Sequence, residues 1–536
     1  MKRRLFVQAL AAGGAMSGRV QAGGATGRRR PNILFILSDD HTMQGFGCYG
    51  SRLAKLNPTP VLDKFARGGA RFDQVFCNNA ICTPSRASII TGQYPQTNRV
   101  LDLEQHLPPA RQYLPQEMKK AGYQTAMIGK WHLGDEPAAF DYYNVLVAHG
   151  QQGSYFDPEF IETGMKFGKH EALGIKTKQY KGHSTDVITD LTIDWLSTGR
   201  NKEQPFFLMH HYKAPHDMFE NAPRYDDYLA DAEIPEPESL YEAGNHGSVA
   251  TRGENDALIH DVGSSVSKRN PTRNMGQHME IDPELDNKEY THLAYQECLK
   301  RYLRCVKGID DNLARLFDYL KKEGLWENTV IFYSGDQGFF LGEHDYIDRR
   351  WAYEEGMRMP LIMHYPKTIK PGTVCDALIN NTDFAPTMLA YAGIETSGYM
   401  QGHSFKTNVE TGEEPDDWRE ATYYRYWMHM AHAHANPALF GLRTKRYKLI
   451  FYYGCDVAPE GRPGWGMCSE FQTPPGWDLY DLKQDPEEMN NVYGNPEYAE
   501  IAKKLKKLLK QEREALNETD KDYPHIQNII AAHWDD

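Results

Sequence analysis

The chain has 536 residues, of which 40% are hydrophobic and 12% aromatic, and its formal net charge at pH 7 is −13. This length and apolar content exclude a disordered chain and allow a large core with more than one domain. The acidic balance argues against a general nucleic-acid-binding function, so no nucleic-acid partner is expected.

The first 30 residues have the pattern of an export signal. A basic start precedes a modest apolar stretch and a small-residue cleavage site near Ala22. Arg3 and Arg4, followed by Leu-Phe-Val-Gln, indicate export by the twin-arginine route to the periplasm or the extracellular space. An ordinary secretory signal and a basic tail are the alternatives. No later run has the length and hydrophobicity of a membrane span.

Strand and helix patterns alternate along residues 31–394. Short apolar runs predict buried strands at 33–37, 124–129, 205–211 and 330–333. Periodic segments predict helices at 61–69, 113–123 and 187–196. This alternation predicts an α/β domain with a large, mostly parallel central sheet that helices cover on both faces.

The rest of the chain has a different organisation. Residues 220–290 lack periodicity, which predicts a long loop excursion. A helix that ends near Gly393 closes the first domain, and residues 395–536 are predicted to form a smaller α+β subdomain with a strand pair within 441–454. Its final helix is amphipathic, with an apolar face formed by Ile501, Leu505, Leu508, Leu509 and Leu516.

Acidic residues follow two of the predicted strands. Asp39 and Asp40 come after the strand at 33–37, and Asp336 and Gln337 come after the strand at 330–333. Ligands of parallel sheets gather at the carboxyl ends of the strands, so both clusters lie where a binding site is expected. For Asp39 and Asp40 alone, capping of a following helix is the alternative.

Cys82 stands directly before the sequence Thr-Pro-Ser-Arg. Thr83 is a good N-cap and Pro84 suits the first helical position, so we expect a helix that ends at Gly92 and leaves Cys82 just outside its N-terminus. The helix dipole and Arg86 favour an anion there, which suits a low-pKa thiol or its oxidised product. For a lone cysteine, a buried structural thiol is the commoner outcome.

The other cysteines do not form a disulfide framework, since there are only eight in the whole chain. Cys77 is close enough in sequence to pair with Cys82, which leaves a disulfide open at this point. Cys298 and Cys305 are predicted to be buried thiols on one helix. Cys455 and Cys468 flank a Gly/Pro-rich loop, where a disulfide and free thiols are equally plausible.

The string Cys-Thr-Pro-Ser-Arg, followed by Ala-Ser-Ile-Ile-Thr-Gly, resembles the signature of the type I sulfatases in the alkaline-phosphatase superfamily. Further blocks are similar to that family and occur in its order: "PNILFILSDD", "GYQTAMIGKWHLG", "HYKAPH", "SGDQGFFLGEH" and "YEEGMRMPLI". "RTKRYKLI" and "WDLYDLKQDPEEMNN" are similar to its C-terminal subdomain. The resemblance implies an alkaline-phosphatase-like fold and a sulfuric ester hydrolase.

The resemblance also implies a modified nucleophile and a metal. Cys82 would be oxidised to Cα-formylglycine by a formylglycine-generating or anaerobic maturation enzyme, and the aldehyde hydrate would attack sulfur. Asp39, Asp40, Asp336 and Gln337 would hold the metal together with modified Cys82. Carboxylate and amide oxygens suit Ca²⁺, with Mg²⁺ as the lesser candidate.

Cationic residues are implied to bind the sulfate group. Lys130 and His132 lie two residues apart on a predicted extended stretch, so their side chains are expected on the same face. The resemblance implies that they match the family's Lys and His, which hold the aldehyde hydrate and a sulfate oxygen. His216 matches the residue that faces the bridging oxygen, and Arg86 adds charge at the helix end. Arg349 stands where the family usually has Lys; arginine binds sulfate through two donors but keeps its proton, so protonation of the leaving group would depend more on His216.

Other positions are weaker candidates. Lys213 and His429 are candidate substrate contacts, with a packing role as the alternative. A second metal site at His429, His432 and His434 is disfavoured because no partner ligands are evident. Asp345 replaces a common glycine of the family, so the local loop geometry is expected to differ.

Sequence blocks also guide the choice of substrate. "EPAAFDYYNVL", "HYKAPH" and "LGEHDYIDRRW" are similar to polysaccharide-desulfating members, which implies a sulfated carbohydrate, with a carrageenan-like galactan favoured. The alternatives are 6-sulfated N-acetylglucosamine in host glycans, a phosphoester or phosphonate, and a non-catalytic glycan-binding role. Oligomeric state is not encoded in these motifs.

Overall fold

A computed structural model describes residues 30–168, 175–241, 247–248, 250–251, 265–267, 269, 275–434, 436–458 and 472–536. The predicted export signal, apart from Arg30, and Cys468, one of the two cysteines for which a disulfide was left open, lie outside these residues. Within the described ranges, no helix is long and apolar enough to cross a bilayer.

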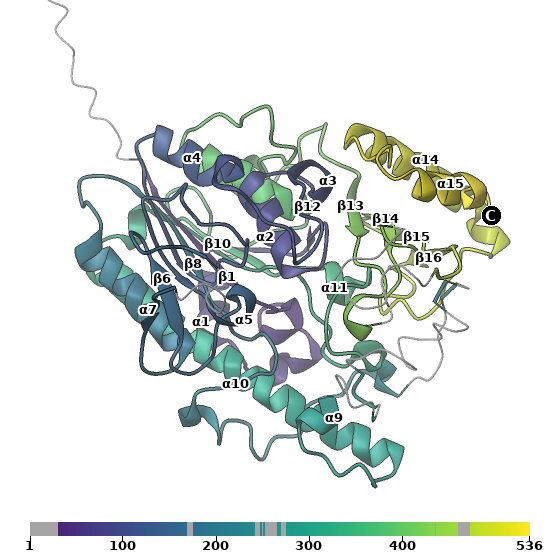
Figure 1. Cartoon of the computed structure of the whole chain (residues 1–536), viewed down its shortest axis with the longest axis horizontal. Helices are drawn as coiled ribbons and strands as arrows, with labels where there is room; N and C mark the ends of the chain where they lie inside the picture. The colour runs from purple at the N-terminus through teal and green to yellow at the C-terminus, as the bar shows by residue number, and fades with distance from the viewer. Residues whose placement is uncertain are drawn as a thin grey trace, which may run out of the picture.

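A ten-stranded sheet forms the centre of the molecule (Figure 1). Its strands are β1 (Asn32–Ser38), β2 (Ala70–Phe72), β4 (Gln124–Gly129), β5 (Tyr142–Leu146), β6 (Glu159–Glu162), β7 (Lys178–Gln179), β8 (Phe206–His211), β9 (Thr329–Gly335), β10 (Leu361–His364) and β11 (Thr373–Cys375). Their order is β11-β2-β10-β9-β1-β8-β4-β5-β6-β7. The central strands β9, β1, β8, β4 and β5 are parallel, whereas antiparallel pairs occur toward both edges. The strands predicted from sequence are the four neighbours β9, β1, β8 and β4, which confirms the α/β prediction.

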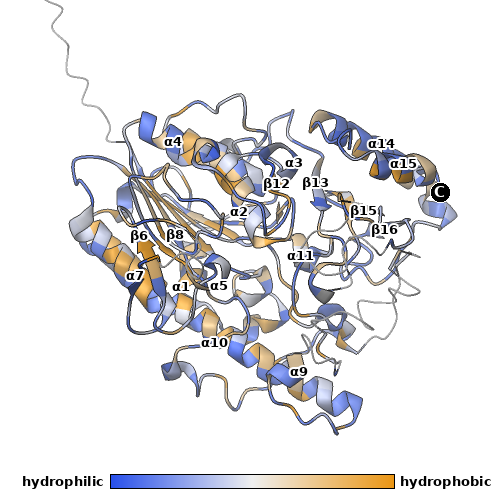
Figure 2. Cartoon of the chain, in the orientation of Figure 1, coloured by the Kyte–Doolittle hydropathy of each residue, from blue (hydrophilic) through white to orange (hydrophobic). Residues whose placement is uncertain are grey.

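Helices cover both faces of this sheet (Figure 1). The long ones are α1 (Pro60–Arg67), α2 (Cys82–Thr91), α4 (Tyr113–Lys120), α7 (Ser184–Asp194), α10 (Asn287–Lys322) and α12 (Phe384–Tyr391). Along β1, Phe35 packs in a core with α2, α4 and α12, and Leu34 packs in a second core with α1, α7 and α10. Because every residue of β1 is buried, the strand is apolar without alternation, as expected for a parallel sheet covered on both sides. Figure 2 shows the same strands as largely hydrophobic.

Shorter elements connect these layers. They are α3 (Pro95–Asn98), α5 (Ala148–Gln151), α9 (Met275–His278), α11 (Glu354–Met357), α13 (Lys406–Thr411) and the parallel pair β3 (Val75–Phe76) and β12 (Ile379–Asn380). The predicted loop excursion between β8 and α10 contains only short helices among its described residues. Cys298 and Cys305 are buried free thiols on α10, as predicted.

The C-terminal subdomain is an antiparallel sheet with two helices. It comprises β13 (Ala421–Tyr426), β14 (Leu439–Thr444), β15 (Tyr447–Tyr452), β16 (Gly476–Asp481), α14 (Ala499–Ala515) and α15 (Pro524–His533). Leu505 and Leu509 of α14 are buried in the core of this subdomain, which confirms its amphipathic face. The prediction that α14 is the final helix is wrong. Asn517 and Asp520 adopt left-handed φ values after it, and Pro524 then starts α15.

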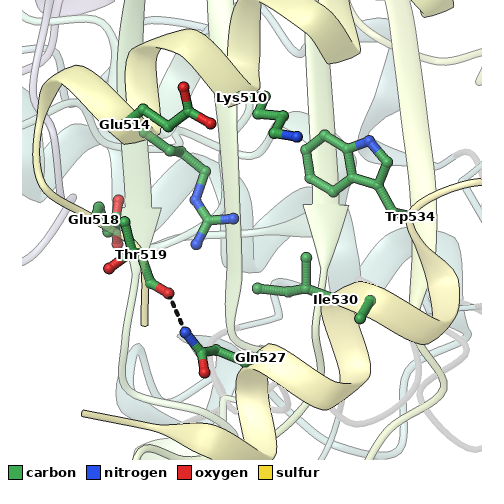
Figure 3. A pocket seen from close by; sticks show the side chains of 9 residues that line it. Lys510, Glu514, Glu518, Thr519, Gln527, Ile530 and Trp534 are labelled. Carbon is green, nitrogen blue, oxygen red and sulfur yellow. Dashed lines mark hydrogen bonds between the residues drawn. The ribbon is translucent and has the colours of Figure 1, made fainter. Parts of the chain in front are cut away.

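A pocket of about 320 Å³ lies between α14 and α15, far along the chain from every predicted catalytic residue (Figure 3). Trp534 and Ile530 form part of its apolar wall, and Lys510 lies across from them. At its base, the Gln527 side-chain amide donates a hydrogen bond to the backbone carbonyl of Thr519 at 2.7 Å. This hydrogen bond joins α15 to the turn between the two helices.

Candidate active site

Cys82 is the first residue of α2, not a residue outside it. Ile81 occupies the N-cap position with extended backbone angles, and the Ser85 amide donates to the Ile81 carbonyl at 3.0 Å. The prediction that Thr83 is the N-cap is therefore wrong by two positions, because the helical hydrogen bonds begin at Ile81. The C-terminal prediction is confirmed: Gly92 closes α2 with φ +65°.

The predicted acidic clusters meet beside Cys82. Ser38 and Gly335 pair at the ends of β1 and β9, so the residues that follow both strands emerge at the same edge of the sheet. The carboxylates of Asp39, Asp40 and Asp336 have ligand atoms within 4.8 Å of one another, and all three side chains are buried.

These carboxylates and Gln337 fit a divalent cation. Buried carboxylates at such distances repel one another unless positive charge lies between or beside them. The Gln337 side-chain nitrogen donates to Asp40 Oδ1 at 2.5 Å, and its Oε1 has no hydrogen-bond partner among the described residues. An unsatisfied buried amide oxygen beside three carboxylates is a donor set for a hard, oxygen-binding metal ion.

Cys82 lies at the centre of this group. Its thiol donates to Asp39 Oδ1 at 3.4 Å, and its sulfur lies 3.8 Å from Gln337 Nε2 and 3.3 Å from Arg349 Nη2. Burial raises the pKa of the Cys82 thiol to about 12. The unmodified thiol is therefore protonated near neutral pH and is a poor nucleophile. Cys77 is also a free thiol, so the two cysteines are not paired.

Each of the three carboxylates is contacted by a basic side chain. Arg86 donates from Nε to Asp336 Oδ2 at 2.9 Å and from Nη1 to the Lys130 carbonyl at 2.7 Å. The Lys130 ammonium pairs with Asp39 Oδ2. Arg349 donates from Nη1 to Asp40 Oδ2 at 2.7 Å. Arg349, where the family usually has Lys, thus reaches Cys82 and a carboxylate at once.

The predicted histidines lie on the same side as Arg349. His216 Nε2 is 3.4 Å from Arg349 Nη2, and its Nδ1 is 2.5 Å from Asp217 Oδ1. Burial lowers the pKa of His216 to about 4 and holds the pKa of His132 well below its usual range. Both imidazoles are therefore neutral at pH 7 before substrate binds. His132 Nδ1 has no hydrogen-bond partner in the described part of the chain.

Residual solvent exposure indicates the entrance to the site. Cys82, Lys130 and Asp336 are 0% exposed. The residues that keep a small exposed fraction of 6–7% are His132, Lys213, His216 and Arg349. The site is therefore least enclosed on the side of the histidines and Arg349. Lys213 packs on this side, with its ammonium 4.7 Å from the centre of the Tyr155 ring.

The histidines near residue 430 have separate positions. His429 is fully buried and its Nδ1 accepts a hydrogen bond from the Ala438 amide at 3.0 Å. His434 contacts Asp348 at 3.2 Å, and His432 contacts Arg350 at 3.4 Å. His432 and His434 thus adjoin the segment that carries Arg349. A substrate contact of His429 stays a prediction.

Asp217 and Asp348 were missed by the sequence reasoning. Asp217 holds His216 Nδ1, and Asp348 accepts from the Arg349 amide at 2.8 Å and lies 3.2 Å from its guanidinium. Each is adjacent in sequence to the residue that it contacts, and this adjacency was the only feature of the sequence that could have indicated the contact. In irregular backbone, adjacency alone does not determine whether two side chains converge.

Residues 31–394 match the family model described as Sulfatase. The chain belongs to the sulfatase family. A second model, N-sulphoglucosamine sulphohydrolase, C-terminal, matches residues 342–458 and 465–515 of the sulfatase. The resemblance noted from the sequence motifs is therefore confirmed, and the enzyme is a sulfuric ester hydrolase.

Characterised relatives resemble the sulfatase over most of its length. It is 37% identical over 527 residues to the N-acetylglucosamine-6-O-sulfatase of Bacteroides thetaiotaomicron, an alignment that covers 92% of this chain and 88% of that protein. It is 27% identical over 428 residues to the N-acetylglucosamine-6-sulfatase of Capra hircus, covering 76% of this chain and 68% of that protein. A solved structure of a protein in complex with its substrate D-glucosamine-2-N,6-O-disulfate is 36% identical, with a TM-score of 0.79, covering 92% of this chain and 99% of that one.

Proposed function

We propose that this sulfatase removes the 6-O-sulfate from N-acetylglucosamine or glucosamine units of glycosaminoglycan-type carbohydrates. The observation that carries the proposal is 37% identity over 92% of the chain to an N-acetylglucosamine-6-O-sulfatase. The galactan favoured from short sequence blocks has less support than the alternative of a 6-sulfated N-acetylglucosamine, because the full-length relatives favour that alternative.

The burial of the site is compatible with a 6-O-sulfate. Cys82 and Lys130 are fully buried, and His132, Lys213, His216 and Arg349 keep 6–7% exposure. A 6-O-sulfate extends from the sugar ring on an exocyclic carbon, which lets the sulfate group project beyond the ring toward these side chains.

We further propose that Cys82 is converted to formylglycine by a maturation enzyme and that Asp39, Asp40, Asp336 and Gln337 hold Ca²⁺. The hydrated aldehyde would supply the nucleophilic hydroxyl, and the cation, when bound by these four residues, would neutralise negative charge on the sulfate oxygens. The high pKa of the unmodified thiol is consistent with Cys82 acting as a precursor and not as the nucleophile itself.

The chain's own residues then have distinct roles. Lys130 and Arg349 bind sulfate oxygens, and Arg86 fixes Asp336 in the orientation needed to accept a proton. His216 donates a proton from Nε2 to the departing sugar oxygen. A bound dianionic transition state raises the pKa of His216, and Asp217 stabilises its imidazolium through Nδ1. His132 is neutral with an unpartnered Nδ1, so it can accept a proton when sulfate is released.

A comparison of matched sulfated sugars tests the substrate assignment. We expect faster sulfate release from N-acetylglucosamine-6-sulfate and glucosamine-2-N,6-O-disulfate than from galactose-6-sulfate or carrageenan oligosaccharides. A preference for the galactans would overturn the proposal. An aryl phosphate hydrolysed faster than an aryl sulfate would instead favour the phosphoester alternative, and no turnover of any ester by matured enzyme would favour a binding role.

Mass spectrometry of the peptide that contains Cys82 tests the modification. Enzyme produced with a maturation system should carry a residue about 18 Da lighter than cysteine at this position. Cys82→Ser should lack activity in that host, whereas Cys48→Ser, a change at a half-buried free thiol, should retain it. An active enzyme with an intact Cys82 thiol would contradict the mechanism.

A further inference from the structure

The loop of residues 341–350, here called the Arg349 loop, is held at several points along its own backbone. Just outside it, the Phe340 amide donates to the Asp348 carbonyl at 2.7 Å, and within it the Gly342 amide donates to the Tyr346 carbonyl at 2.9 Å. The Tyr346 hydroxyl donates to the Arg349 carbonyl at 3.2 Å. The position of the Arg349 backbone therefore depends on where Tyr346 and its neighbours are fixed.

Asp345, at the turn of this loop, is bound to a distant segment of the chain. Its carboxylate accepts hydrogen bonds from the Ser265 hydroxyl at 2.5 Å and the Ser267 amide at 2.8 Å, and also from the Ser267 hydroxyl. The Val266 amide donates to the Asp345 carbonyl at 3.1 Å. Ser265 also pairs with Tyr346 in an isolated antiparallel bridge.

Residues 265–267 belong to the long excursion between β8 and α10. Val266 is fully buried in the core on the α10 side of the sheet, so this short segment is packed as well as hydrogen-bonded. Earlier in the same excursion, the Ser248 amide donates to Asp478 Oδ1 of β16 at 2.8 Å. The excursion thus contacts both the Arg349 loop and the C-terminal sheet through buried aspartates.

The backbone at Asp345 would suit glycine better. Its φ is +59°, and that of His344 is +54°, so both adopt the left-handed region. Non-glycine residues are strained there, although Asp tolerates this region better than most. A strained residue is retained where the surrounding contacts over-determine it, and the hydrogen bonds of Asp345 with residues 265–267 are such contacts.

We propose that Asp345 is a positioning residue that fixes the Arg349 loop to residues 265–267 and so holds the Arg349 guanidinium in place for the sulfate group. This rests on the proposed role of Arg349 in sulfate binding. The chain of contacts runs from Ser265 and Ser267 to Asp345, through Tyr346, to the Arg349 backbone. Residues 265–267 thereby influence the affinity for the sulfate ester through Asp345.

Kinetics of three variants test this positioning. Asp345→Gly removes the acceptor and relieves the backbone strain, so thermal stability should change little while KM rises and kcat/KM falls by about tenfold. Ser265→Ala with Ser267→Ala should raise KM in the same way. Asp345→Asn keeps one acceptor oxygen and tolerates left-handed φ, so it should restore most of the affinity. Ser197→Ala, at a half-buried helical serine whose hydroxyl donates to the Asp194 carbonyl, serves as the matched control.

Hydrogen exchange provides a readout that needs no substrate. The Ser267 amide should exchange faster in Asp345→Gly than in the wild type because its acceptor is lost. Unchanged exchange would show that Asp345 does not anchor the segment. Faster exchange with KM unchanged in all variants would show that anchoring does not position Arg349. If the wild type hydrolyses phosphate esters instead of sulfate esters, the proposed function fails, and the same KM comparison on the phosphate ester still decides the role of Asp345.

Discussion

Arg349 makes the most varied contacts of any residue in the site. Its guanidinium reaches Asp40, Cys82 and His216 from one position, with Nη1 on the carboxylate and Nη2 between sulfur and imidazole. A planar guanidinium supplies such divergent donors from fixed directions, whereas an ammonium is a point charge on a flexible stem. At the residue scale, this site is therefore built for arginine although the family usually has lysine.

Arg349→Lys should consequently impair the enzyme even though it recovers the usual family residue. We expect kcat/KM for the sulfate ester to fall by about 10- to 100-fold, because the shorter side chain loses one of the two donor positions. Sulfate release at several substrate concentrations measures the effect. Arg99→Lys, at an exposed ion pair with Asp522, should leave the kinetics unchanged. Wild-type kinetics for Arg349→Lys would show that the charge alone matters.

At the scale of single elements, the start of α2 is the position where a local sequence rule failed. Thr-Pro is a strong N-terminal signal, but the helix begins earlier because the buried backbone of Ile81 already accepts the first helical hydrogen bond. Thr83 is then inside the helix, and its hydroxyl has no hydrogen-bond partner in the portion of the chain that is described. Tertiary packing has overridden the capping preference of the isolated sequence.

Thr83→Val tests this arrangement because it replaces the hydroxyl with a methyl group of similar size. A true N-cap would lose about 1 kcal/mol of stability on this change. An unpartnered buried hydroxyl should instead give an unchanged or slightly higher Tm in thermal unfolding. Thr189→Val is the matched control in α7, since the Thr189 hydroxyl bonds the Thr185 carbonyl and contacts the Tyr212 hydroxyl. We expect Tm to fall for that variant alone.

The elements that sequence predicted well are those whose pattern is local. The central strands are buried on both faces, so their apolar runs are unmistakable, and the carboxylates after them identified the site edge. The proposals for the nucleophile, the metal ligands and Lys130 came from family motifs and not from periodicity. Asp217, Asp348 and the second C-terminal helix were missed because each depends on irregular backbone whose course is set by distant contacts.

At the scale of the whole molecule, a buried ionic cluster joins the C-terminal sheet to the catalytic part. Glu354 of α11 accepts two hydrogen bonds from Arg443 of β14, each of 3.1 Å, and lies 3.1 Å from the Lys448 ammonium of β15. Lys448 also pairs with Glu488 at 2.7 Å. Glu354 follows the Arg349 loop by four residues, so this cluster fixes the C-terminal sheet next to the active site.

Adjacent glutamates in α11 allow a matched test of this cluster. Burial opposes ionisation of Glu354, but Arg443 and Lys448 outweigh it and hold its pKa below the usual value of 4.5. Burial, with Glu343 and Glu488 nearby, raises the pKa of Glu355 well above that value. Glu354 is therefore a carboxylate in the folded protein at neutral pH, whereas the surroundings of Glu355 favour its neutral acid form.

Glu354→Gln should destabilise the protein by about 3 kcal/mol, because it leaves two buried cations with one carboxylate between them. Glu355→Gln resembles the neutral acid form that the surroundings of Glu355 favour, so its stability should stay within about 0.5 kcal/mol of the wild type. Thermal unfolding at pH 7 compares the two variants. Folding depresses the pKa of Glu354, so the stability that its carboxylate contributes is complete above pH 4.5. This contribution is lost as the pH falls toward the lower pKa of the folded state. The difference in Tm between the two variants should therefore shrink on acidification. Equal Tm values for both variants at pH 7 would mean that the cluster does not hold the C-terminal sheet against the catalytic part.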